Sequence, residues 1–303
     1  MLFKKLWHSL LSLFSQITPI TEINSLEELQ KLSLKQLSSV TALNLDNSNL
    51  NSNKRNILIS ALSAMPNLEI LSLNNTNLNP DGMQAIAPSL MNLHCLSLDT
   101  NNLGEAGAQI LAANLINMPN LHDLSLEDNN LNNAGIQAII PALRNVSQFR
   151  TLNLAINHLD EAGMQAIAPT LSKMTDLKIL NLGYNNFGTN GANSLAISLK
   201  TMSKLEILFL HGINPGQAGT SALISSLITL PNLQMLNLAM NRIDQAEAKA
   251  LAHSLSEMPK LELLNLSYNK FSLTVLGEIR AITNQNEIHA IIHKTAPNCR
   301  VIS

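Results

Sequence analysis

Residues 124–140 read LSLEDNNLNNAGIQAII, and the spacing of the apolar residues changes within this stretch. Leu124 and Leu126 are two residues apart, which is the period of a β-strand. Ile136, Ile139 and Ile140 are three and four residues apart, which is the period of an α-helix. The stretch therefore predicts a short strand followed directly by a helix.

The same pattern recurs along the chain at a fixed interval. Successive units begin 28 residues apart, except for one step of 25 residues. Their first apolar residues, here called position 0, are Val40, Leu68, Leu93, Leu121, Phe149, Leu177, Leu205, Leu233 and Leu261. One such unit buries too few aliphatic side chains to offset the backbone entropy that is lost on folding. Neighbouring units must therefore stack, which predicts a solenoid with a parallel sheet inside and helices outside.

Each unit carries further residues at fixed positions. Apolar residues occupy positions 0, 3, 5 and 10, and most units have an asparagine at position 8. Six units have a glycine at position 14, near the start of the helix, where close packing or an unusual turn is expected: Gly82, Gly107, Gly135, Gly163, Gly191 and Gly219. Proline inside the helical pattern predicts a kink or an end to the helix at Pro88, Pro141 and Pro169.

The pattern L-x-x-L-x-L-x-x-N-x-L, with the glycine and the full helix, resembles the leucine-rich repeat of the ribonuclease-inhibitor-like subfamily. The resemblance implies an α/β horseshoe of about nine repeats over residues 40–283, between an N-terminal cap (1–39) and a C-terminal cap (284–303). It also implies that the position-8 asparagines form a ladder that bonds turn backbone: Asn101, Asn129, Asn157, Asn185, Asn241 and Asn269. Ile213 interrupts this ladder and Pro215 replaces an apolar anchor, which indicates either a remodelled loop or a tolerated lapse.

Composition excludes several classes of function. A net charge of −2 and a pI near 6.4 give no reason to expect nucleic-acid binding. Two distant cysteines, Cys95 and Cys299, argue against a disulfide framework and favour a reducing, cytoplasmic compartment. No apolar run is long enough for a transmembrane helix. No phosphate-binding loop is present, and no cofactor is expected.

The two ends of the chain carry other candidate features. Residues 1–20 predict an amphipathic helix that either caps the solenoid or touches a membrane surface through Trp7 and its neighbours. His289 and His293 lie four residues apart on an expected C-terminal helix, which is metal-ligand spacing without a third ligand. We expect a surface helix there and no metal site.

The residue types on the concave face suggest a binding surface. A strand that buries positions 0, 3 and 5 presents positions 2, 4 and 6 on the concave side, with position 7 at the edge. In the C-terminal half these positions predict an exposed apolar and aromatic tract: Ile156, Ile179, Tyr184, Ile207, Phe209, His211, Met235, Met240 and Tyr268. In the N-terminal half they predict an acidic surface: Asp99, Asp123, Glu127 and Asp128.

These features favour a non-enzymatic, monomeric module that binds a partner protein through its concave face, with acidic strands steering a basic patch on the partner. Similarity to repeat-only effectors of intracellular bacteria implies secretion into a host cell. A cytosolic inhibitor or scaffold of the ribonuclease-inhibitor type is the alternative, and a metal-dependent enzyme using the C-terminal histidines is a third hypothesis. His94 and His122 occupy the same position in adjacent units, so they should lie close together.

Overall fold

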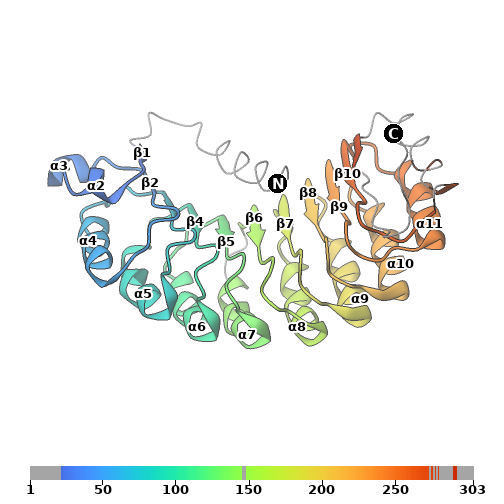
Figure 1. Ribbon diagram of the computed structural model, residues 1–303, viewed down its shortest axis with the longest axis horizontal. Coiled ribbons are helices and arrows are strands. Elements are labelled where there is room, and N and C mark those ends of the chain that lie inside the picture. The colour runs from blue at the N-terminus through green and yellow to red at the C-terminus, as the bar shows by residue number, and fades with distance from the viewer. Residues whose placement is uncertain are drawn as a thin grey trace.

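The repeats form an open arc with strands along its inner side and helices along its outer side (Figure 1). The computed structural model describes residues 22–144 and 148–272, and beyond them Thr274, Val275, Gly277, Ile279 and 289–291. The helix predicted over residues 1–20, most of the predicted C-terminal cap, His293 and Cys299 lie outside the described residues. No described helix has the length and the apolar character that crossing a membrane requires.

The strands follow one another in sequence order within a single parallel sheet. Each repeat contributes one short strand, and the helix between strands returns the chain to the same edge, as parallel pairing requires. The strands are β1 (Glu22–Ile23), β2 (Ala42–Asn44), β3 (Ile70–Ser72), β4 (Cys95–Ser97), β5 (Asp123–Ser125), β6 (Thr151–Asn153), β7 (Ile179–Asn181), β8 (Ile207–Phe209), β9 (Met235–Asn237), β10 (Leu263–Asn265) and β11 (His289–Ile291).

The helices lie side by side on the convex side of the arc (Figure 1). They are α2 (Leu26–Leu29), α3 (Leu34–Leu37), α4 (Ser52–Leu62), α5 (Asn79–Ile86) with the short 3-10 helix η1 (Ala87–Ser89), α6 (Gly104–Leu115), α7 (Asn132–Leu143), α8 (Glu161–Leu171), α9 (Gly188–Leu199), α10 (Gly216–Leu227) and α11 (Gln245–Leu255). Each repeat therefore consists of one strand and one helix that face each other. This explains why the spacing of the apolar residues changes within each repeat.

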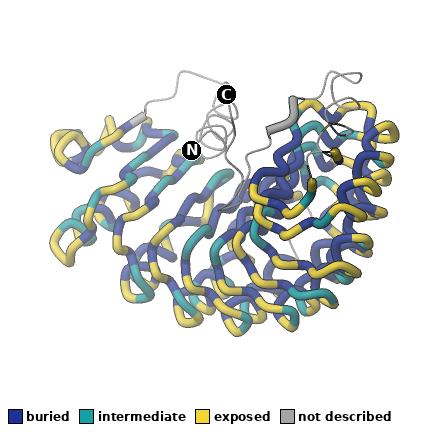
Figure 2. The backbone as a smooth tube through the Cα atoms, turned by 45° about the vertical axis from the view of Figure 1, so that its right-hand side comes forward, coloured by how far each residue is buried: buried dark blue, intermediate teal, exposed yellow. Residues whose placement is uncertain are grey.

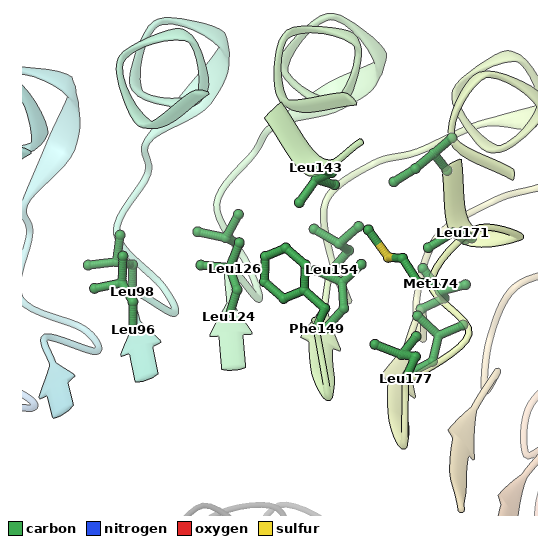
Figure 3. Packing of buried hydrophobic residues seen from close by; sticks show 14 of the residues in the cluster. Leu96, Leu98, Leu124, Leu126, Leu143, Phe149, Leu154, Leu171, Met174 and Leu177 are labelled. Atoms are coloured by element: carbon green, nitrogen blue, oxygen red, sulfur yellow. The ribbon is translucent and has the colours of Figure 1, made fainter. Parts of the chain in front are cut away.

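A single core runs the length of the arc between the sheet and the helices. Positions 3 and 5 are leucine in all nine repeats, and these leucines are almost completely buried. Figure 3 shows how Phe149 packs between Leu124 of the preceding repeat and Leu154 of its own. Because each repeat buries its apolar residues partly against its neighbours, the repeats stabilise one another.

The position-14 glycines allow neighbouring helices to approach closely, as predicted. A Cβ atom on Gly219 would lie 2.8 Å from the Cβ atom of Ala192, and one on Gly135 would lie 3.2 Å from that of Ala108. None of the six has a positive φ, so the reason for glycine here is space and not backbone conformation. Pro88 lies in the 3-10 helix η1, so the regular helix ends before it as predicted. Pro141 and Pro169 lie inside α7 and α8, which end at the same repeat position as α9 and α10, so these two prolines do not shorten their helices.

The asparagine ladder is present. The Oδ1 atom of Asn185 accepts hydrogen bonds from the backbone N–H groups of Asn157 (3.1 Å) and Leu159 (3.0 Å). Its Nδ2 group donates to the carbonyl oxygens of Leu154 and Leu182, both at 3.0 Å. One side chain thus joins the turns of two consecutive repeats.

The interruption of this ladder at Ile213 is a tolerated lapse. The Ile213 side chain is fully buried, and its backbone N–H still donates to Asn241 Oδ1 at 2.9 Å. Strand β8 and helix α10 on either side keep the lengths of their counterparts. The loop that contains Pro215 is therefore not remodelled.

The described residues extend the sheet by one strand at each end. Strand β1 pairs with β2, and β11 pairs with β10. The prediction that His289 lies on a helix is wrong, because it begins β11. Ala290 and Ile291 after it pair in register with Leu264 and Asn265 of β10.

Candidate protein-binding surface

Large apolar side chains from neighbouring strands meet on the concave face, at positions 2 and 4. Ile179 pairs in register with Ile207, and Asn181 pairs with Phe209. Ile179, Ile207 and Phe209 form a cluster separate from the main core, with Met235 packed against it. The sequence predicted these residues to be exposed, but Phe209 is only 3% exposed and the two isoleucines are also buried. Neighbouring strands are about 4.8 Å apart, so large side chains at equal positions cover one another.

Position 7 follows the strand and has one backbone conformation in every repeat. All nine residues have a positive φ, between 53° and 67°: Asn47, Asn75, Thr100, Asp128, Ile156, Tyr184, Gly212, Met240 and Tyr268. This left-handed conformation costs most residues about 1–2 kcal/mol, and only glycine, asparagine and aspartate adopt it readily. The turn that ends each strand therefore favours a small set of residues at position 7.

The two halves of the chain differ in the residue types at position 7. The N-terminal repeats have asparagine, threonine or aspartate at position 7, whereas the later repeats have Ile156, Tyr184, Met240 and Tyr268. Tyr184, Met240 and Tyr268 remain 47%, 44% and 45% exposed, so burial does not explain them. We call these three side chains the rim surface. Large side chains are therefore present at positions where the backbone disfavours them.

Replacing Ile156 with asparagine should raise the free energy of unfolding by about 1 kcal/mol, since a β-branched residue is poorly suited to a left-handed backbone. Urea denaturation of the two proteins measures the change. Asp128→Asn is the control, at the same position of the preceding repeat, and should change stability little. A loss of stability in Ile156→Asn would mean that packing of the half-buried isoleucine outweighs the backbone strain.

Tyr184 belongs to a cluster that spans three repeats. Its ring lies edge-on to the imidazole of His211, with centroids 4.7 Å apart, and its hydroxyl contacts Met240 Sδ at 3.3 Å. His211 in turn lies edge-on to Phe209, at 6.3 Å between centroids. The cluster therefore joins the buried concave residues to the exposed rim surface.

Two glycines make room for these rings. A Cβ atom on Gly183 would overlap the imidazole of His211, and one on Gly212 would lie 2.8 Å from Cδ1 of Tyr184. Gly212 also has a φ of +67°. The sequence alone did not single out Gly183 and Gly212, although they stand at positions 6 and 7, which carry polar side chains in the first four repeats.

His211 behaves as an apolar residue. Burial lowers the pKa of its imidazole to about 4, because the interior disfavours the charged form. Its Nδ1 atom is buried and has no hydrogen-bond partner within the described part of the chain. At neutral pH the imidazole therefore adds no charge to this surface.

The acidic residues of the N-terminal half have a structural role. Asp99 Oδ1 accepts hydrogen bonds from Ser125 Oγ at 2.5 Å and from the backbone N–H of Glu127 at 2.8 Å, both in the next repeat. Asp46 makes the same pair of contacts one repeat earlier, with Ser72 Oγ and the N–H of Asn74. These carboxylates therefore bond consecutive repeats together.

The prediction that Asp99 and Asp123 form an exposed acidic surface is wrong, since both are buried. Glu127, half-buried, accepts a hydrogen bond from Asn153 Nδ2 at 3.0 Å, and Asp128 is half-buried at its left-handed position. The later repeats, except the one with Phe209, have asparagine at position 4, which bonds within its own repeat: Asn181 Oδ1 accepts from the N–H of Gly183. The pairing with serine accounts for the carboxylates of Asp46 and Asp99 in the early repeats.

His94 and His122 are stacked, as their shared position predicts. Their rings are 5.6 Å apart at an angle of 7°. His122 Nδ1 lies 2.8 Å from Asp123 Oδ2, and His94 Nδ1 lies 3.5 Å from Glu69 Oε2. Burial beside Asp123 raises the pKa of the Cys95 thiol, so this cysteine is not activated as a nucleophile. In the described ranges, no three His, Cys, Asp or Glu side chains gather to hold a metal.

A comparison with known families agrees with the periodic leucines and the ladder. The family model described as "Leucine Rich repeat" matches residues 64–87, 117–139 and 173–196. This chain is built from leucine-rich repeats. Solenoids of stacked repeats use their concave side for binding. The leucine-rich repeats of this chain also form a concave side, lined by one parallel sheet. No curated protein matches the chain in sequence.

Solved structures similar to these leucine-rich repeats include TLR13 in its complex with ssRNA13, at 19% identity and a TM-score of 0.49. That match covers 88% of this chain and 34% of the TLR13 chain, so this chain spans about a third of that protein. The leucine-rich repeat-containing protein LegL7 from Legionella pneumophila is also similar, at 17% identity and a TM-score of 0.43. That match covers 88% of this chain and 98% of the LegL7 chain. The ribonuclease-inhibitor-like subtype stays a prediction.

Proposed function

We propose that this chain binds a partner protein through the rim surface, Tyr184, Met240 and Tyr268. The observation that carries the proposal is the presence of large exposed side chains on a left-handed backbone, where the N-terminal repeats have asparagine, aspartate or threonine. Strain of this kind persists where a side chain has a function that outweighs its effect on stability. Tyrosine and methionine are also enriched in protein interfaces.

The geometry suits such a role. Parallel strands hold successive position-7 residues at a fixed spacing, so the rim surface is ordered before a partner arrives. Tyr184 is held by His211 and Met240, and its ring needs little further ordering on binding. The steering of a basic patch by acidic strands finds no support in buried Asp99 and Asp123, so the proposed partner contacts apolar and aromatic groups.

Affinity capture from a lysate, followed by mass spectrometry, tests the proposal with the full chain as bait. The variant carries Tyr184→Asn, Met240→Asn and Tyr268→Asn together. We expect it to lose the partner captured by the unaltered chain while its thermal unfolding midpoint stays equal or rises. Retention of the partner would refute the site.

A matched control removes three exposed side chains from elsewhere. Met91, Ile116 and Ile228 share one position at the ends of their helices and are 54%, 64% and 46% exposed. Replacing these three with asparagine should leave capture unchanged. Loss of capture in the control as well would show that the bait binds through general hydrophobicity.

The finer proposal is that the chain is a bacterial effector that acts on a host protein inside the host cell. Its support is the resemblance of the repeats to those of such effectors. A reporter fused to the chain and followed during infection should appear in host cytosol. Confinement of the reporter to the producing cell would favour the alternative, a cytosolic inhibitor or scaffold.

A further inference from the structure

The residue two places after position 7 also has a left-handed backbone in most repeats. Position 9 has a φ between 51° and 59° in six of the nine repeats, and its side chain is exposed in all nine. The strands that precede this turn are the buried part of the arc (Figure 2). Position 9 is asparagine in every repeat except three, which have His158, Arg242 and Lys270. Asparagine is therefore the residue that this turn favours.

Arg242 stands where asparagine would be the favoured residue. Its φ is +59°, which an arginine rarely adopts. In the two preceding repeats, Asn214 Nδ2 donates to Asn186 Oδ1 at 3.1 Å, and among the described residues this row of bonds does not continue to Arg242. A large exposed side chain on a left-handed backbone is the same exception that the rim surface makes at position 7.

The charge of this edge of the arc, formed by positions 6–10, changes sign from one end to the other. In the first four repeats these positions contain acidic residues and no Lys or Arg: Asp46, Asp99, Glu127 and Asp128. In the last two repeats they contain Arg242 and Lys270 and no Asp or Glu. The acidic residue nearest to Arg242 in the sequence, Asp244, caps α11 by accepting from the N–H groups of Ala246 and Glu247. The edge beside the rim surface is therefore basic.

Within the described part of the chain, no carboxylate neutralises either of these two cations. At the other end of the strands a lysine does pair with the next repeat, since Lys178 Nζ lies 2.9 Å from Glu206 Oε1. Arg242 and Lys270 are exposed, and each follows a rim-surface residue by two places. Two residues span at most about 7 Å of chain. The cations therefore border the apolar and aromatic side chains directly.

We propose that the partner segment that binds the rim surface is acidic. This inference rests on the proposed function. The carboxylates of the segment pair with Arg242 and Lys270, while its apolar side chains pack on Tyr184, Met240 and Tyr268. An arginine guanidinium can donate two parallel hydrogen bonds to a carboxylate. Charges at the edge of an interface steer the partner and fix its register.

A peptide suits this surface better than nucleic acid does. Proteins that bind nucleic acid gather many Lys and Arg side chains on one face, because affinity comes from contacts with phosphates. Here only two cations lie beside a methionine and two tyrosines, in a chain with a net charge of −2.

Peptide selection tests the charge preference. A phage-displayed library of random peptides is selected on the immobilised full chain, and the bound peptides are sequenced. We expect enrichment of Asp and Glu beside apolar residues, although the net charge of the chain disfavours acidic peptides. On the variant that combines Arg242→Glu with Lys270→Glu, the enrichment should change to Lys and Arg.

Lys173 and Lys200 provide the matched control. Both are exposed and lie at the C-terminal ends of α8 and α9. Lys173→Glu with Lys200→Glu changes the net charge by the same amount and should leave the acidic preference intact. Fluorescence polarisation of one selected peptide should show about tenfold weaker binding to the Arg242→Glu and Lys270→Glu variant, and little change in the control. Circular dichroism checks that each variant is folded.

Three results would overturn the proposal. The first is a set of selected peptides without a charge preference. The second is an acidic preference that persists in the folded variant with Arg242→Glu and Lys270→Glu. The third is tighter binding of a labelled oligouridylate than of the selected peptides, with loss of that binding in the same variant, which would assign the two cations to nucleic acid.

Binding of the selected peptides to the rim-surface variant separates this inference from the proposed function. Loss of binding there, together with peptides that carry no acidic bias, would support the rim surface and refute the acidic segment. Equal binding to the rim-surface variant and the unaltered chain would refute the rim surface as the site, and this inference with it.

Discussion

Replacing Asn185 with alanine is expected to lower the free energy of unfolding by about 3 kcal/mol or more. Its buried amide accepts hydrogen bonds from two backbone N–H groups of the preceding repeat and donates to two carbonyl oxygens. Alanine would leave these groups unpaired in the interior, and each such group costs about 1–3 kcal/mol. The loss would weaken the joint between two repeats in the middle of the arc.

The neighbouring residue provides the control. Asn186 is exposed, and among the described residues its side chain makes one hydrogen bond, in which Oδ1 accepts from Asn214 Nδ2 at 3.1 Å. Asn186→Ala should change the free energy of unfolding by less than about 0.5 kcal/mol. Urea denaturation followed by circular dichroism measures both variants. Equal effects of the two substitutions would contradict the role of the ladder.

Replacing Asp99 with asparagine is expected to stabilise the protein at alkaline pH. Burial raises the pKa of the Asp99 carboxyl to about 7, well above the ordinary value of 3.8. Between these two pKa values the folded state binds more protons than the unfolded state, so stability falls as pH rises from about 4 to about 7. The full shift corresponds to at most about 4 kcal/mol, and relaxation of the site reduces this figure.

Asparagine can take over the contacts of this side chain. Asn74 occupies the same position one repeat earlier, and its Oδ1 accepts from Ser97 Oγ at 2.8 Å and from the N–H of Asp99 at 2.7 Å. Asp99→Asn should therefore be more stable than the unaltered chain at pH 8, by a few kcal/mol. Its advantage should shrink toward pH 4, where the native carboxyl is protonated.

Urea denaturation at pH 5 and pH 8 measures this difference. Asp160→Asn is the control, because hydrogen bonds from Asn133 and from the N-terminal N–H groups of α8 lower the pKa of Asp160. That carboxyl is ionised at both pH values, so its loss should not alter the dependence of stability on pH. A pH profile of Asp99→Asn parallel to that of the unaltered chain would show that Asp99 is ionised throughout.

The fold follows from local patterns, which is why the sequence predicts it well. Leucine at positions 3 and 5 and asparagine at position 8 each act within one repeat or between adjacent ones, so a short stretch such as 124–140 contains the whole rule. Repetition then fixes the stack. The lapse at Ile213 left the fold intact because the neighbouring Asn241 still receives the backbone N–H.

The binding surface was harder to predict, because exposure depends on what lies across the face. Tyr184, Met240 and Tyr268 are exposed as the sequence suggested, whereas Phe209 and Ile179 are buried in a cluster with side chains from neighbouring strands. The left-handed backbone at position 7 could have been inferred from Asn47, Asn75 and Asp128. Tyr184 and Tyr268 in the later repeats do not indicate a left-handed backbone, because tyrosine rarely adopts one.

The acidic bias was misinterpreted for a similar reason. Asp99 and Asp46 are matched to serines at position 4 of the following repeats, and this pairing becomes visible only when the repeats are aligned in space. His289 was assigned to a helix by its spacing from His293. The edge of the parallel sheet, which the local pattern does not contain, takes up residues 289–291 as a strand.

Site-specific crosslinking tests most directly whether the rim surface is where the partner binds. The photoreactive residue p-benzoylphenylalanine is placed at position 184 or 268 and, in separate controls, at positions 116 and 197 on the convex side. We expect irradiation to join the captured partner to the chain at positions 184 and 268 and not at 116 or 197. Crosslinking at the convex positions, with none at 184 or 268, would contradict the account.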